Sequence, residues 1–139
     1  MANPHFINQS DEENTNIKYD VEGLALYYLP EGEGYLIASS QGNNSYAIFN
    51  RKEPHEYLGS FQITDAEIDG VSDTDGIDVT NQAFGSIYPS GLFICQDGSN
   101  TDSGEKQSQN FKLVHWEDIA NVFDPKLRTD TEYKAKNSE

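Results

Sequence analysis

The sequence predicts an all-β protein made of two similar halves. Short strand-like runs recur along its 139 residues, and brief turn signals separate them. The order of motifs in residues 20–43 is repeated in residues 73–100. A repeat of roughly fifty residues, each forming a sheet of about four strands, is the signature of β-propeller blades. We therefore expect about two four-stranded antiparallel blades.

The first half contains four strand-like runs, at residues 23–29, 35–40, 45–51 and 56–63. The segments between them are short and contain Pro, Gly or Asn, so neighbouring strands must run antiparallel. This pattern predicts a four-stranded meander. Residues 1–18 are polar and acidic, and we expect them to form a flexible lead-in.

The second half predicts strands at residues 77–79, 91–96 and 110–115. Apolar residues spaced from Trp116 to Val122 favour a short helix, which Pro125 would end. Residues from 124 onward are rich in charge. The expected organisation is a lead-in over 1–18, a propeller segment over 19–123 and a charged tail over 124–139.

The repeat is clearest where the first strand of each half begins. Asp20-Val21-Glu22-Gly23-Leu24 matches Asp73-Thr74-Asp75-Gly76-Ile77 as acid, any residue, acid, glycine, aliphatic. Residues 36–43 then resemble residues 92–100, allowing one inserted residue. Two linked matches in the same order favour a true repeat over chance similarity.

Residues 67–78 contain five carboxylates and no cation. Carboxylates this dense repel one another, so the stretch is either a solvated acidic loop or the site of an oxygen-binding cation, of which calcium is the first choice. An EF-hand is excluded: centring the loop on Gly76 puts Val71 and Gln82 at its first and last ligand positions.

A propeller would bring the acidic residues of both halves together. The first strand of each blade lines the central channel, so residues just before it lie at one mouth of the channel. Asp20 and Glu22 are two residues apart on an extended chain, which places them on one face about 7 Å apart. The neighbouring blade would bring Asp73 and Asp75 close by, with Asp69 and the turn from Asp97 to Asn100 as further oxygen donors. We therefore expect these oxygen donors to form a calcium-binding site.

The composition and net charge of the chain limit the classes of partner that it could bind. A formal net charge of −15 and a pI near 4.3 argue against nucleic acid and anionic membranes, which would repel the chain. Cys95 lies in an apolar run and is predicted to be a buried structural thiol. The three histidines lack zinc-ligand spacing. The N-terminus has no signal-peptide pattern, so export cannot be read from it.

Several segments resemble the β-propeller phytases, six-bladed calcium-dependent phosphatases of bacteria that hydrolyse inositol hexakisphosphate (phytate). The similar segments are residues 20–24, 34–46, 72–79, 96–98 and 109–120, and the run Ser39-Ser40-Gln41-Gly42-Asn43 is the most specific. By this resemblance Asp20, Glu22 and Asp69 take the places of carboxylates around the active-site calcium ions. Asp75, Asp97 and Asn100 take places at or near calcium ions that stabilise the fold, and Gln41 is a weaker match.

The resemblance implies part of a calcium-dependent 3-phytase, extracellular or periplasmic, whose partners are phytate or another phosphorylated small molecule and the remaining propeller blades. Two departures stand out: Ser99 replaces an expected acidic residue, and two blades cannot close a ring. The family's phosphate-binding cations come mostly from earlier blades, so we expect the isolated chain to be inactive. The alternatives are a non-catalytic, calcium-stabilised incomplete propeller that binds a phosphorylated ligand or partner, and an acidic β-module engaged only in protein contacts.

Overall fold

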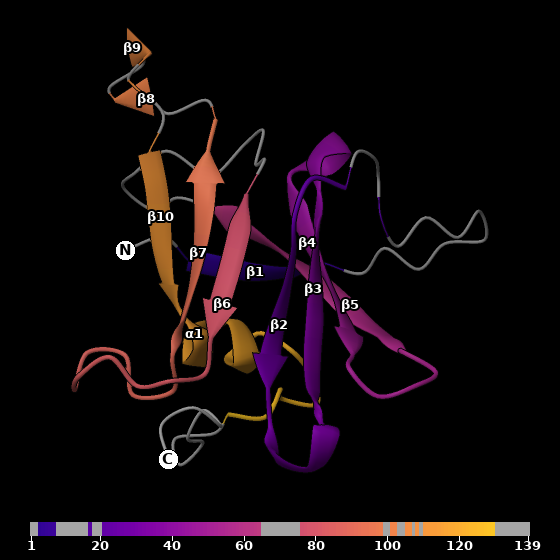
Figure 1. Cartoon of the computed structure of the whole chain (residues 1–139). Coiled ribbons are helices and arrows are strands. Elements are labelled where there is room, and N and C mark those ends of the chain that lie inside the picture. Colours follow the sequence, from indigo (N-terminus) through magenta and orange to yellow (C-terminus); the bar gives the residue numbers. More distant parts are fainter. Residues whose placement is uncertain are drawn as a thin grey trace.

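The structure, a computed structural model, describes residues 3–7, 17, 21–64, 76–98, 101–102, 105–106, 108 and 110–129. These residues form two antiparallel sheets, a small two-stranded ribbon and one short helix (Figure 1). The first sheet has the order β1-β5-β4-β3-β2 and the second has the order β10-β7-β6. The all-β class and the blade-like antiparallel sheets predicted from the sequence are confirmed.

The first sheet contains the predicted meander. Its strands are β2 (Leu24–Tyr28), β3 (Gly34–Ser40), β4 (Ser45–Asn50) and β5 (Tyr57–Thr64). Two short 3₁₀ turns, Pro30–Gly32 and Gln41–Asn43, connect β2 to β3 and β3 to β4. Because each turn is short, every strand pairs antiparallel with the next one along the chain.

A fifth strand, β1 (Asn3–Ile7), pairs antiparallel with β5 at the outer edge of this sheet. Pro4 lacks a backbone N–H, and an edge strand is where a proline is tolerated. The ring of Phe6 meets the ring of Phe123 edge-on, with centroids 5.2 Å apart. The prediction of a flexible lead-in is therefore wrong for residues 3–7, which are held by backbone pairing and by this aromatic contact.

The second sheet consists of β6 (Ile77–Thr80), β7 (Leu92–Asp97) and β10 (Asn110–His115). It has three strands within the described residues, one fewer than the predicted blade. The ribbon joins β8 (Thr101–Asp102) to β9 (Glu105–Lys106). Gly91 precedes β7 with φ at 94°, and a Cβ there would collide with the Thr80 carbonyl, so the close approach of residue 91 to the end of β6 requires glycine.

The predicted helix is present as α1 (Trp116–Asn121), with Glu117 and Asp118 in its first turn. Acidic side chains there complement the positive end of the helix dipole. Within the described part of the chain, no helix has the length and the apolar run needed to cross a membrane.

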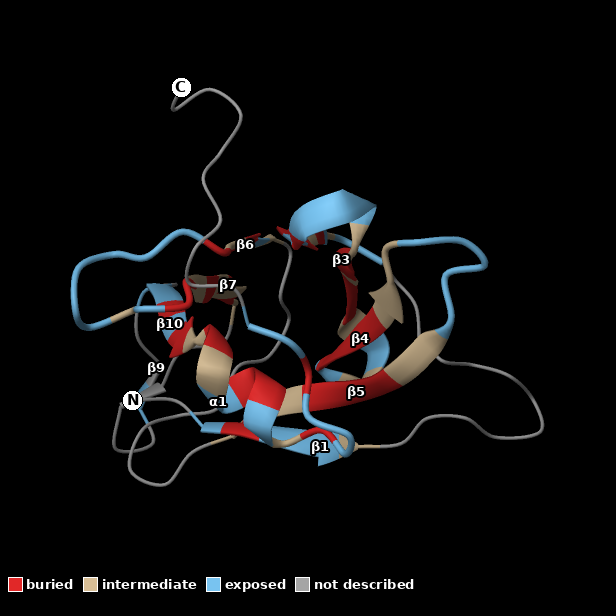
Figure 2. Ribbon diagram, turned by 90° about the horizontal axis from the view of Figure 1, so that it is seen from below, coloured by how far each residue is buried: buried red, intermediate tan, exposed pale blue. Residues whose placement is uncertain are grey.

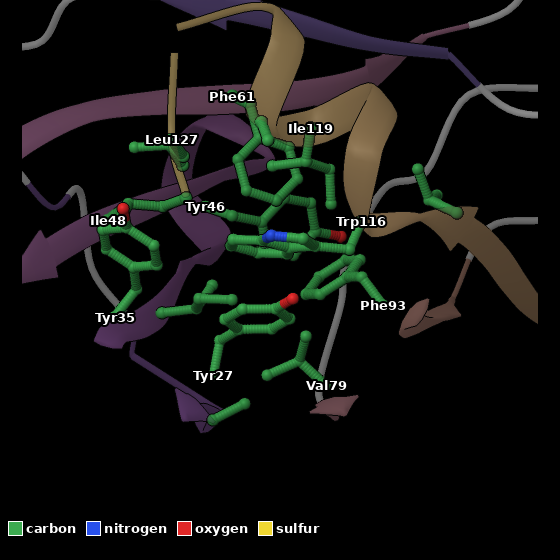
Figure 3. Packing of buried hydrophobic residues seen from close by; sticks show 14 of the residues in the cluster. Tyr27, Tyr35, Tyr46, Ile48, Phe61, Val79, Phe93, Trp116, Ile119 and Leu127 are labelled. Carbon is green, nitrogen blue, oxygen red and sulfur yellow. The ribbon is translucent and has the colours of Figure 1, made fainter. Parts of the chain in front are cut away.

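The core lies between the two sheets (Figure 2), and its largest fully buried side chains are aromatic. Trp116 stacks on Tyr27 with ring centroids 4.0 Å apart and an interplanar angle of 13° (Figure 3). Phe93 of the second sheet meets Tyr46 and Phe61 of the first sheet edge-on, at 5.1 and 5.4 Å. Such pairs add to the stabilisation from apolar burial, so the sheets pack face to face as a single unit.

The segment after α1 closes one end of this core. Leu127 is buried, and its N–H donates to the Ala120 carbonyl at 3.1 Å. The Arg128 N–H donates to the Tyr35 hydroxyl at 2.8 Å, while the Trp116 indole N–H donates to the Arg128 carbonyl at 3.0 Å. The predicted charged tail therefore begins too early, because residues 124–129 pack against the domain.

Candidate functional site

The strands β2 and β6 lie side by side and run in the same direction, so their N-terminal ends meet at one end of the molecule (Figure 1). Between them lies a groove of about 370 Å³. Its lining comes from β2, β3 and β6 and consists of Leu24, Ala25, Leu26, Tyr28, Leu36, Asp78 and Val79. The first strands of the two halves therefore begin at the same end of the molecule; Asp20, Asp73 and Asp75 lie outside the described residues, so a mouth shared by their carboxylates stays a prediction.

The same backbone contact anchors both strand starts. The Ser39 N–H donates to the Gly23 carbonyl, and the Gln96 N–H donates to the Gly76 carbonyl, each at 2.9 Å. The structure thus supports the repeat at the two Asp-x-acid-Gly motifs. Equivalent hydrogen bonds at Gly23 and Gly76 thus mark the same position at the start of each strand.

Glu22 is held in place through its backbone. The buried hydroxyl of Ser39 accepts hydrogen bonds from the N–H of Glu22 at 3.1 Å and from the N–H of Gly23 at 2.8 Å. The Glu22 residue itself is exposed. A fixed backbone with an exposed carboxylate suits a side chain that binds something from solution, and the sequence did not reveal this role of Ser39.

The neighbouring turn between β3 and β4 is also tightly hydrogen-bonded. The side-chain oxygen of Asn43 accepts from the hydroxyls of Ser40 and Ser45 at 3.0 and 2.7 Å, and Gln62 donates to the Asn43 carbonyl at 2.9 Å. Asn44 follows in the left-handed conformation that Asn tolerates well. These hydrogen bonds give a structural reason for the run from Ser39 to Asn43, because they fix the turn that lies beside the start of β2.

Asp97 occupies a different environment from Glu22. Its side chain is fully buried, and one carboxylate oxygen lies 3.6 Å from the ammonium nitrogen of Lys112, which is itself only 9% exposed. A buried carboxylate needs such a partner to offset its desolvation. The cross-strand pairing of β7 with β10 brings Lys112 beside it. The predicted role of Asp97 as a metal ligand stays a prediction.

Cys95 lies next to this ion pair and is fully buried. Burial raises the pKa of the Cys95 thiol from 9.0 to about 11, so the thiol stays protonated at neutral pH. A protonated, inaccessible thiol is a poor nucleophile. The prediction of a buried structural thiol is confirmed.

The remaining predicted ligands, Asp20, Asp69, Asp75 and Asn100, lie outside the described residues. The structure therefore places the strand ends that flank them and not their side chains. Across the part of the chain that it describes, no three His, Cys, Asp or Glu side chains gather closely enough to hold a metal ion.

The chemistry of the candidate ligands can still be compared with that of calcium. Asp20, Glu22, Asp69 and Asp75 are all carboxylates, and calcium prefers six to eight oxygen ligands over nitrogen or sulfur. Glu22, exposed at the shared mouth, fits such a ligand set. Asp97 fits less well, because a cationic side chain already lies beside it.

The cations of the β4–β5 turn lie at the opposite end of the first sheet. Arg51 donates to the Glu33 carbonyl at 3.1 Å and stacks over Tyr28, while Lys52 pairs with the Glu33 carboxylate at 2.9 Å. The hydrogen bond from Lys52 lowers the pKa of Glu33. Neither cation is placed to bind a ligand at the β2 and β6 starts.

Two comparisons with known proteins agree. The sequence model of the Phytase family matches residues 6–138. The 3-phytase of Bacillus subtilis (strain 168) is 58% identical over 102 residues, which cover 73% of this chain. The match covers 27% of that relative, so the chain spans about a quarter of the length of the curated protein it resembles.

Proposed function

Because the chain belongs to the phytase family, we propose that it is a section of a calcium-dependent phytase that hydrolyses the phosphomonoesters of phytate. The observation that supports this proposal is that β2 and β6, the strands that follow the two acidic motifs in sequence, are adjacent and parallel and begin with equivalent hydrogen bonds at Gly23 and Gly76. The family is built as a β-propeller, and the two sheets would be two of its blades.

In this proposal Asp20, Glu22 and Asp69 hold the metal of the active site, while Asp75 lies at or near calcium that stabilises the fold. Calcium bound there would neutralise charge on phosphate oxygens and favour ionisation of a water molecule. The described residues contribute by positioning the metal ligands. The Ser39 hydroxyl fixes the backbone of Glu22, and the Asn43 side chain fixes the neighbouring β3–β4 turn through hydrogen bonds. A ligand that is already in place loses little entropy when it binds.

Among the described residues, no Lys or Arg side chain lies at this end to bind a phosphate group. Arg51 and Lys52 lie in the β4–β5 turn at the opposite end of the first sheet, Lys112 faces Asp97 in the core, and Lys126 and Arg128 lie in the segment after α1. Phytate is strongly anionic, and a net charge of −15 repels it. We therefore propose that the remaining blades of a longer phytase supply the phosphate-binding cations, and that the chain alone has little activity.

The shortage of cations at this mouth also favours a second candidate, a calcium-stabilised propeller module without catalysis that binds a phosphorylated ligand or partner. The two candidates share the metal site and differ in phosphate release. For either, the family suggests an extracellular or periplasmic location.

Calorimetric titration with calcium tests the shared site. The Glu22→Gln variant should bind calcium at least about tenfold more weakly than the wild type, because a ligand charge is lost from a site built of carboxylates. Glu31→Gln is the matched control, since Glu31 is exposed in the β2–β3 turn at the far end of the strand. Equal affinities for all three proteins would show that overall acidity, and no defined site, attracts the ion.

A further inference from the structure

The first strands of the two halves, β2 and β6, lie side by side although they belong to different sheets. Both strands are fully described, and β2 ends the first sheet while β6 ends the second, so no backbone ladder joins them (Figure 1). Apolar packing, such as that of Val79 beside Tyr27, holds them together (Figure 3). Apolar contacts have no preferred direction, so packing alone does not fix how far β6 is shifted along β2.

The side chain of Asn81 joins the end of β6 to the end of β2. Asn81 directly follows β6, and its amide nitrogen donates to the carbonyl oxygen of Tyr28, the last residue of β2, at 2.8 Å. Asn81 is only 4% exposed. A buried amide that lost its acceptor would bear the cost of desolvation without a hydrogen bond, so this bond resists a shift of either strand.

This hydrogen bond connects equivalent positions of the repeat. Asn81 and Tyr28 are 53 residues apart, and so are Gly76 and Gly23, the glycines that precede the two strands. The pairings of β2 with β3 and of β6 with β7 run without a register shift. In both halves the glycine therefore precedes the bonded residue by the same length of regular strand, about 17 Å. The bond thus holds the two strand starts at the same level.

A second hydrogen bond between the two halves lies at this end of the molecule. The Tyr27 hydroxyl donates to the Ser90 carbonyl at 2.9 Å. Ser90 belongs to the connection that leads into β7, whereas Asn81 is continuous with β6 itself. Asn81 is therefore the residue that ties β6 directly to β2.

The level of the strand starts matters because the acidic motifs follow the same spacing. Glu22 precedes Gly23 as Asp75 precedes Gly76, and Asp69 belongs to the segment that leads from β5 to β6. A shift of β6 by one residue along β2 would move the second strand start by about 3.3 Å. Calcium binds oxygen at about 2.3–2.6 Å, so its ligands would no longer converge after such a shift.

We propose that Asn81 is a positioning residue for calcium, because it sets the level of β6 on β2 and so aligns the ligands that precede the two strands. This inference rests on the calcium site of the proposed function. Asn81 lies at the far ends of both strands and does not contact the ion. Without its hydrogen bond the carboxylates, which repel one another, could move apart, and calcium would have to restore their arrangement on binding.

Calorimetric titration of the 139-residue chain with calcium tests the inference. Asn81→Ala removes the donor, and Asn81→Leu removes it while keeping a side chain of similar size. Both variants should bind calcium at least about tenfold more weakly than the wild type, the lower end of the loss caused by removing a supporting residue from a metal site. Circular dichroism at the titration temperature establishes that each variant is folded.

Tyr35→Phe is the matched control. Tyr35 is 6% exposed, and its hydroxyl accepts a hydrogen bond of 2.8 Å from the Arg128 N–H, away from β6. The variant loses one hydrogen bond between distant parts of the chain and keeps the aromatic ring beside Trp116. It should lower the urea midpoint about as much as Asn81→Ala, because each loses one hydrogen bond, and it should bind calcium as tightly as the wild type.

Wild-type affinity in both Asn81 variants, together with weaker binding by Glu22→Gln, would overturn this inference and leave the proposed calcium site in place. Equal losses of affinity in Asn81→Ala and Tyr35→Phe would also overturn it, since a general loosening of the fold would explain both. A wild type that binds no calcium would overturn the inference together with the proposed site.

Discussion

Trp116 joins the two sheets to the helix, and replacing it with alanine should cost most of the stability of the fold. The side chain is fully buried, stacked 4.0 Å from Tyr27 and 5.8 Å from Tyr35. Truncation of a buried tryptophan removes its apolar transfer energy and leaves a cavity, which together cost about 3–5 kcal/mol. Its indole N–H also donates to the Arg128 carbonyl, a bond worth about 1 kcal/mol.

The expected loss of about 4–6 kcal/mol is large against the roughly 5–15 kcal/mol that stabilises a typical domain. Urea unfolding followed by far-UV circular dichroism measures it, because Trp116 is the only tryptophan and its removal abolishes the fluorescence probe. Trp116→Phe should lose only about 1–2 kcal/mol, since an aromatic ring remains over Tyr27. Ile87→Ala is the surface control, at 65% exposure. A loss below about 1 kcal/mol for Trp116→Ala would refute the reasoning.

Two further perturbations examine the interior of the second sheet. Lys112→Met should destabilise the chain by about 3–5 kcal/mol, because Asp97 stays buried without its cation. Lys52→Met should change stability by less than about 1 kcal/mol, because the Lys52–Glu33 pair is exposed. Similar urea midpoints for the two variants would contradict this expectation. Burial raises the pKa of the Cys95 thiol in the folded chain, so as pH rises the thiol ionises in the unfolded chain first. This ionisation favours the unfolded chain, so the stability that the protonated Cys95 thiol contributes is complete below pH 9.0 and is lost by about pH 11. Unfolding free energies over that range should fall more steeply for the wild type than for Cys95→Ala, by roughly 3 kcal/mol in total, and parallel curves would contradict the burial argument.

The regular part of the fold followed from the sequence because its determinants are local. The expected strands at 35–40 and 45–51 agree with β3 and β4 to within a residue at each end. Their apolar runs and the intervening Gln-Gly-Asn-Asn turn specify both strands and an antiparallel pairing. The helix was predictable for the same reason, from its apolar spacing and acidic first turn.

The features that were missed depend on distant partners. Asn3–Ile7 contains a proline and few apolar residues, and it becomes a strand because the edge of β5 is available for pairing. Leu127 is one apolar residue in a charged segment, and it is buried because α1 and Tyr35 present partners there. The pairing of Asp97 with Lys112 likewise follows from the β7–β10 register, which no local pattern specifies.

The candidate site was likewise predictable from the sequence only in part. The matching Asp-x-acid-Gly motifs correctly predicted that two strand starts would lie together, since a repeat implies equivalent positions. The buried Ser39 hydroxyl that fixes Glu22 was not predictable, because its two donors lie 16 and 17 residues away in sequence.

We propose that this chain is a working section of a calcium-dependent phytase. The most direct measurement is phosphate release from phytate by a chimera of the Bacillus subtilis 3-phytase, in which the 102-residue matching segment is replaced by that of this chain. We predict calcium-dependent release by the chimera, its loss on Glu22→Gln, its retention on Glu31→Gln, and background release by the 139-residue chain alone. A folded chimera without activity, or full activity in the Glu22→Gln chimera, would contradict the account.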